Sequence, residues 1–189
     1  MKSGRRCAWG GVAGPAGFVG AWVVAGALTE RYSPVNDAIS RLAAVHAPQR
    51  GIMTAGFVTF GVAVPLFGLA LRDHLPGPAW MSAVGTGLAT LGVAALPLDV
   101  SPAVDAAHGV AATAGYVTLA AVPLFAARPL ARLGFRGAAA ASAATGAASA
   151  LCLAATVIGS RHGLFQRAGL TLGDAWVAAT AVWILRTKR

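Results

Sequence analysis

Asp105 and His108 are the pair of residues best suited to acid–base chemistry, because they lie three positions apart. On a helix this spacing puts both side chains on one face, where a carboxylate can orient an imidazole and raise its basicity. Ionisable groups at membrane depth are costly and usually functional, so we take both as candidate catalytic residues. A polar pair at the membrane surface is the alternative interpretation.

Asp174 is the side chain with the largest free-energy cost of membrane insertion, since it lies midway along the apolar stretch "LTLGDAWVAAT". A bare charge at the centre of a bilayer costs about 2.5–3.5 kcal/mol on insertion scales. An apolar environment favours a neutral carboxyl group, and a neutral carboxyl in a dry pocket can donate a proton. A structural hydrogen bond to a neighbouring helix is the alternative.

The other candidate residues belong to segments that we expect at one face of the membrane. Asp37 and Asp99 complete the candidate acids, and four of the six acidic residues lie in these segments. Arg167 opposes the dipole at the start of its helix, so we expect an acidic partner from Asp37, Asp99 or Asp105, or else a role as a headgroup anchor. Aromatic side chains among the candidates would stabilise a carbocation through their ring faces. The candidate substrate-binding residues are Tyr32, Ser40, Tyr116, Arg161, Phe165, Gln166, Arg167 and Trp176.

Metal and cofactor chemistry finds little support in the residue spacing. Three histidines, His46, His108 and His162, are expected at the same face as several aspartates. Their spacing matches no compact zinc-ligand motif, so we predict no metal site and no cofactor.

The composition predicts the elements that must position these residues. The chain has 189 residues, of which 57% are hydrophobic and 11% are charged, whereas a soluble domain carries about 25% charged residues. Apolar stretches of about 20 residues recur, and backbone amides in hydrocarbon must pair within a helix. We therefore predict an all-α polytopic membrane bundle that forms a single integral membrane domain over residues 1–189. The six predicted spans are roughly 7–29, 51–71, 81–98, 106–127, 138–158 and 165–185.

The positive charge is unevenly placed. Six spans put ten of the 15 Lys and Arg residues on the side of the two termini and five on the other side. The positive-inside rule then predicts a cell-membrane protein with both termini in the cytoplasm. The same charge suits anionic lipid headgroups, and we expect no nucleic-acid partner.

Two short matches within the chain suggest repeated helical hairpins. "SPVNDAIS" at 33–40 shares four positions with "SPAVDAAH" at 101–108, and "VPLF" occurs at 64–67 and at 122–125. Repeats in membrane proteins often meet at a site. The Ser-Pro-x-x-Asp pattern also has a plain structural meaning, because Ser caps a helix, Pro suits its first position and Asp favours its first turn.

Separated motifs carry a resemblance to a known family. "YSPVNDAISRLA" at 32–43, "PLD" at 97–99, His108 and "GLFQR" at 163–167 together resemble the membrane family called domain of unknown function 998. The resemblance covers most of the chain and implies a six-span layout, but it brings no activity. Gln166 stands where the family usually has an acidic residue. The resemblance implies site positions at Tyr32, Pro34, Ile39, Ser40, Asp99, His108 and Arg167.

These features favour an intramembrane enzyme that acts on an isoprenoid or another lipid. Asp174 or Asp99 would protonate an alkene or epoxide, by analogy with small membrane terpene cyclases. A metal-dependent lipid hydrolase is the second chemistry. A small transporter or channel subunit, which would need a homodimer, and a non-catalytic membrane scaffold are the remaining alternatives.

Overall fold

The computed structural model describes residues 2–158 and 160–187, and every regular element within them is helical. Five segments are long and apolar enough to cross a membrane, namely Gly4–Ala27, Arg50–His74, Pro102–Arg132, Arg136–Ile158 and His162–Arg186. The predicted all-α polytopic bundle is therefore confirmed. The elements are α1 (Lys2–Ala8), α2 (Gly10–Ala27), the 3-10 helix η1 (Ile39–Ala43), α3 (Arg50–His74), α4 (Ala79–Ala95), α5 (Pro102–Arg132), α6 (Arg136–Ile158) and α7 (His162–Arg186).

The third predicted span is the short one. Helix α4 has 17 residues, which is about 26 Å at 1.5 Å per residue and less than the roughly 30 Å of hydrocarbon. It ends at Ala95, three residues before the predicted boundary, because the segment Leu96-Pro97 leaves the helix. A proline disfavours helical backbone at the residue before it.

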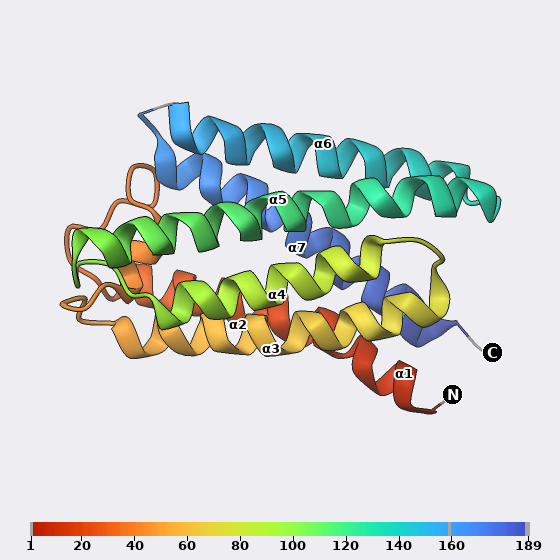
Figure 1. Ribbon diagram of the computed structural model, residues 1–189, viewed down its shortest axis with the longest axis horizontal. Helices are drawn as coiled ribbons and strands as arrows, with labels where there is room; N and C mark the ends of the chain where they lie inside the picture. The colour runs from red at the N-terminus through yellow and green to blue at the C-terminus, as the bar shows by residue number, and fades with distance from the viewer. Residues whose placement is uncertain (1, 159, 188–189) are drawn as a thin grey trace.

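The helices run up and down, and consecutive helices lie side by side (Figure 1). Helix α7 closes the bundle by returning to α2, while α6 packs against α5 and α7. Helix α1 begins and α7 ends at one end of the bundle. The opposite end, which we call the loop end, carries residues 28–49, 96–101 and 160–163 (Figure 1).

Glycine permits the closest helix crossings. A Cβ atom at Gly10 would overlap the carbonyl oxygen of Ala63, which joins α2 to α3. A Cβ atom at Gly87 would overlap the ring of Pro65, which joins α4 to α3. Close backbone approach of this kind is the usual basis of helix association in membranes.

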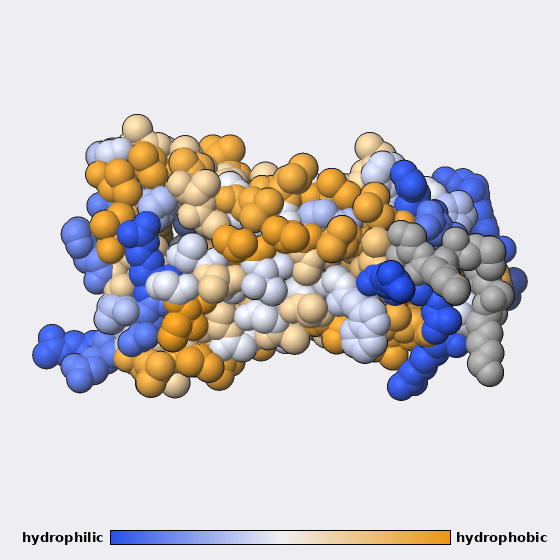
Figure 2. All heavy atoms as spheres, turned by 90° about the horizontal axis from the view of Figure 1, so that it is seen from below, coloured by the Kyte–Doolittle hydropathy of each residue, from blue (hydrophilic) through white to orange (hydrophobic). Residues whose placement is uncertain are grey.

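The face of the molecule drawn in Figure 2 is mainly apolar along the middle of the bundle and carries its most polar residues at the two ends. The exposed large apolar residues include Val110, Val117, Leu151, Val157 and Ile158, on α5 and α6. Such a surface suits acyl chains and explains why the chain carries so little charge.

The two Ser-Pro motifs adopt different structures. Ser101 caps α5 as expected, since its hydroxyl accepts a hydrogen bond from the N–H of Val104 over 3.3 Å. The hydroxyl of Ser33 accepts the equivalent bond from the N–H of Asn36 over 3.3 Å, but no α-helix follows. The first copy forms a turn, in which the N–H of Ser33 donates to the carboxylate of Asp37 over 2.7 Å, and η1 comes next. Asn36 beside Asp37 favours turns, whereas the second copy has Ala and Val in the corresponding region.

Candidate functional site

A cavity of about 50 Å³ lies inside the loop-end half of the bundle, among α2, α3, α4, α5 and α7. Its walls are mainly apolar, and η1 covers it through Ile39 and Ser40. The apolar wall includes Phe18, Phe57, Phe60, Leu119 and Leu170, and the polar groups come from Ser40, Thr86, Thr90, Tyr116 and Gln166.

Gln166 joins the cover of the cavity to its wall. Its side-chain oxygen accepts a hydrogen bond from the backbone N–H of Ile39 over 2.7 Å. Its amide nitrogen donates to the hydroxyl of Tyr116. Because Gln166 is only 3% exposed, both bonds form away from water, where they hold η1 in a defined position.

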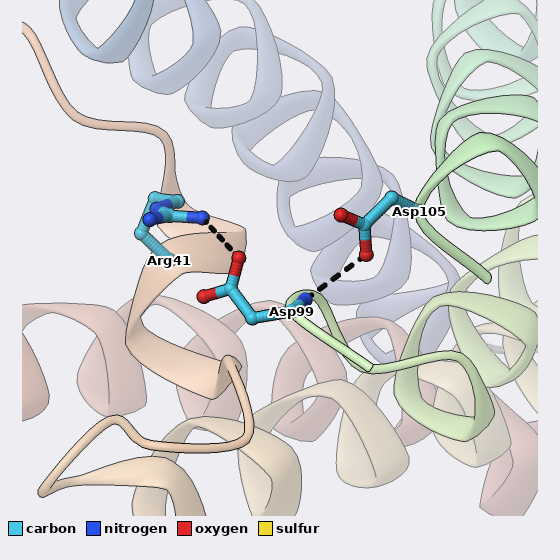
Figure 3. A network of polar contacts seen from close by, with 3 residues as sticks. All are labelled: Arg41, Asp99 and Asp105. Carbon is cyan, nitrogen blue, oxygen red and sulfur yellow. Dashed lines mark hydrogen bonds and ion pairs between the residues drawn. The ribbon is translucent and has the colours of Figure 1, made fainter. Parts of the chain in front are cut away.

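A second set of contacts holds η1 to the connection between α4 and α5. Arg41 donates to the carboxylate of Asp99 over 3.0 Å, and the N–H of Val45 donates to the carbonyl of Leu98 over 3.1 Å. The N–H of Asp99 in turn donates to the carboxylate of Asp105 over 2.9 Å (Figure 3). Asp99 has a φ of 69°, a left-handed conformation that Asp tolerates better than most residues.

Arg167 is a buried cation whose two terminal nitrogens are hydrogen-bonded, whereas its Nε has no partner among the described residues. Its Nη1 donates to the carbonyl oxygens of Pro34, Asp37 and Gly163 at 2.8, 3.0 and 3.0 Å. Its Nη2 donates to the hydroxyl of Tyr32. The prediction that Arg167 has a carboxylate partner is wrong, because Arg167 forms no ion pair with the other residues of 2–158 and 160–187. Arg167 acts instead as a staple that fixes the turn before η1.

Aromatic rings complete the surroundings of this guanidinium. Its carbon lies 5.2 Å from the ring centre of Trp22 and 5.4 Å from that of Tyr32, which is cation–π distance. Burial raises the pKa of Tyr32 above its ordinary value of 10.0, and the charge of Arg167 opposes part of this rise. The hydroxyl of Tyr32 therefore stays protonated and donates to the carbonyl of Ala38 over 3.2 Å.

The candidate pair Asp105 and His108 does not form a hydrogen bond. The carboxylate of Asp105 accepts from Asp99, whereas Nδ1 of His108 lies 2.6 Å from the carbonyl oxygen of Leu96. A carbonyl oxygen can only accept, so Nδ1 of His108 carries a hydrogen. Nε2 is buried and has no partner among the described residues. His108 lies one helical turn from Ala112, which lines the cavity.

Asp174 is buried in α7 and does not line the cavity. It is 3% exposed, and neither carboxyl oxygen has a hydrogen-bond partner within the described ranges. It lies one turn beyond Leu170 on the same face of α7, deeper in the bundle than the cavity wall. The alternative interpretation, a hydrogen bond from Asp174 to a neighbouring helix, is therefore not found within residues 2–158 and 160–187.

The remaining candidates lie apart from the cavity. Trp176 donates its indole N–H to Ser142 of α6 over 2.8 Å, Arg161 is exposed at the start of α7, and Phe165 is half-buried one residue before Gln166. His46 and His162 are exposed. No group of three or more potential metal ligands was found in residues 2–158 and 160–187.

The sequence reasoning missed the two threonines of the wall. Thr86 donates to the carbonyl of Ser82 over 2.9 Å, and Thr90 donates to the carbonyl of Thr86 over 2.8 Å. Threonines in apolar helices usually satisfy themselves in this way, so they carry no signal of a site. Their position one turn apart on α4 was the available clue.

Fold and site together define a multi-pass helical membrane protein with a small covered cavity inside one half of the bundle. The chain belongs to the family described as protein of unknown function (DUF998), which matches residues 12–183. The resemblance seen in the sequence motifs is therefore confirmed. No curated protein and no solved structure matches the chain.

Proposed function

We propose that this protein binds an isoprenoid or another lipid in the cavity beneath η1. The observation that carries the proposal is a mainly apolar, aromatic-rich cavity that lies inside the loop-end half of the bundle. Apolar walls with a few polar groups are typical of small-molecule sites. A ligand that is dissolved in the bilayer would gain little from apolar contact alone, so the polar wall groups would provide selectivity.

The size of the cavity limits what enters while η1 is closed. About 50 Å³ admits a few water-sized groups, so the closed cavity would hold a polar head or a short branched segment. A longer chain would extend between helices or require η1 to move. Such a movement would break the hydrogen bond between Ile39 and Gln166 and the ion pair between Arg41 and Asp99, and it would expose the buried side chain of Leu42.

The catalytic form of this proposal assigns the proton to Asp174. Its carboxyl group is buried and has no hydrogen-bond partner within the described residues. Asp99 does not line the cavity, and its carboxylate pairs with Arg41 near the surface. The carboxylates of Asp37 and Asp105 accept hydrogen bonds from the backbone N–H groups of Ser33 and Asp99.

We also propose that the loop end faces the outside of the cell membrane. Among residues 2–158 and 160–187, eight Lys and Arg residues lie at the end opposite to the loop end and five lie at the loop end, and positively charged ends usually remain in the cytoplasm. A reporter that is active only in the cytoplasm should therefore be active when it is fused to the C-terminus. If a reporter that is active only in the periplasm is active at the C-terminus, the orientation is the opposite of the one proposed.

The binding proposal is tested by filling the cavity. Ala112→Leu adds three carbons to the cavity wall, whereas Ala114→Leu adds them on the exposed side of the same helix. Each protein is extracted in polymer-bounded membrane discs, and its lipids are analysed by mass spectrometry against the bulk membrane. We expect one lipid or isoprenoid to be enriched with the wild type and Ala114→Leu, and to be lost with Ala112→Leu. An identical lipid profile for all three proteins would contradict the proposal.

A further inference from the structure

The orientation of the Gln166 amide is fixed by its surroundings. The backbone N–H of Ile39 can only donate, so the atom that it reaches at 2.7 Å must be the amide oxygen of Gln166. The amide nitrogen is then the atom that faces Tyr116, and a nitrogen of this kind can only donate. The hydroxyl oxygen of Tyr116 therefore accepts this hydrogen bond.

This arrangement leaves the hydroxyl hydrogen of Tyr116 unused. No hydrogen bond donated by Tyr116 occurs among residues 2–158 and 160–187, although its side chain lines the cavity. A hydroxyl that already accepts from one side directs its hydrogen elsewhere. The cavity is the space that this hydrogen can reach.

The neighbouring wall groups differ from Tyr116 in this respect. The hydroxyl hydrogens of Thr86 and Thr90 are directed to backbone carbonyls of their own helix. Ser40 lines the cavity and makes no side-chain hydrogen bond in the described part of the chain, so its hydroxyl can adapt to either role. Tyr116 is therefore a donor without an acceptor among the described residues, and Ser40 is an adjustable group that lines the same cavity.

We infer that the cavity selects an apolar molecule with a hydrogen-bond acceptor oxygen, such as an isoprenoid or lipid ketone, quinone or ether, through the hydroxyl of Tyr116. This inference rests on the proposed function, because it names the chemistry of the ligand that the same cavity takes. A hydrocarbon would leave the Tyr116 hydroxyl without a partner in an apolar site, which is unfavourable. The bridge from Ile39 through Gln166 to Tyr116 also connects the cover of the cavity to the group that reads the ligand.

The test compares geranylacetone, an isoprenoid ketone, with the hydrocarbon of the same carbon skeleton. Binding to the detergent-solubilised protein is measured by native mass spectrometry, and the carbonyl stretch of 13C-labelled geranylacetone is measured by infrared spectroscopy. We expect the wild type to prefer the ketone and to lower its carbonyl stretching frequency relative to detergent alone. Tyr116→Phe should weaken ketone binding about three- to tenfold, remove the frequency shift and leave hydrocarbon binding unchanged.

Thr156→Val is the matched control, because it removes a hydroxyl that only donates to Cys152 within α6. It should retain both the preference and the frequency shift. Equal binding of ketone and hydrocarbon by the wild type, with an unshifted carbonyl band, would overturn the inference and leave the proposed function standing. Binding of neither probe would overturn both. The comparison of the two probes on the wild type does not depend on whether Tyr116→Phe folds.

Discussion

Arg41 and Asp99 lie 58 positions apart in the sequence and form an ion pair of 3.0 Å at the loop end (Figure 3). The pair joins η1 to the connection between α4 and α5. The bond between Ile39 and Gln166 joins the same short segment to α7. The cover of the cavity is thus held from two sides by residues that the membrane-spanning helices place.

Asp99→Asn tests the ion pair without changing the backbone, because Asn also tolerates the left-handed conformation at this position. The two side chains are 54% and 39% exposed, so the pair should contribute less than about 1 kcal/mol. We expect a small fall in the thermal stability of Asp99→Asn at low salt, and a smaller difference from wild type at high salt.

Glu30→Gln is the control for this variant, since it removes an exposed acid that takes part in neither ion pair of the described residues. It should change stability little at any salt concentration. A large loss for Asp99→Asn that does not respond to salt would show that the carboxylate of Asp99 has another role.

Arg167→Lys tests the staple before η1. Lysine keeps the charge but cannot reproduce the fork that contacts Pro34, Asp37 and Tyr32. Buried carbonyl groups would lose their donors, so we expect a loss of about 3 kcal/mol or more in the free energy of unfolding. Arg161→Lys, at an exposed position of the same segment, should change the stability by much less. Equal stabilities of the two variants in thermal unfolding would contradict the staple.

The fold could be predicted from the sequence because the length of an apolar stretch alone determines whether it spans a bilayer. The contacts of the site could not, because spacing along one helix does not give the rotation of its neighbours. Asp105 and His108 do share one end of α5, yet each finds its partner in the connection before that helix. Gln166 was selected as a substrate-binding residue, but its link to Ile39 joins positions 127 residues apart, a distance that local patterns do not report.

Arg167 shows a second physical limit of the sequence. A cation at the start of a helix opposes the helix dipole, which suggests a carboxylate partner. Charged side chains are visible in a sequence, so such a partner is the one that sequence reasoning looks for. Backbone carbonyls are invisible to that reasoning, since every residue has one. The turn at 33–38 provides two of them only because Asp37 binds the N–H of Ser33 and bends the chain.

Tyr32 predicts a pH dependence of stability. Burial raises its pKa in the folded state above the ordinary value of 10.0. Its contribution is therefore fully present below pH 10 and is lost as the pH rises through the folded-state pKa, because the unfolded chain releases the proton first. We expect thermal stability to fall above about pH 10, and Tyr32→Phe to fall less steeply with pH than the wild type, whatever its stability at pH 8. Parallel slopes for the two proteins between about pH 9 and 11.5 would contradict this.

Asp174→Leu separates stability from activity. A buried carboxyl without a partner costs free energy, so replacing it with an apolar side chain should raise the free energy of unfolding by roughly 1 kcal/mol or more. Ala175→Leu, at an exposed neighbouring position on α7, should have little effect.

If Asp174 donates a proton to the ligand, product formation from an isoprenoid epoxide or alkene should be abolished in both Asp174→Leu and Asp174→Asn. A destabilised Asp174→Leu would indicate a structural partner, and unchanged turnover in a folded Asp174→Asn would remove the carboxyl from the chemistry. Uptake of a labelled solute by liposomes that is lost in the same variants, without product formation, would support transport instead.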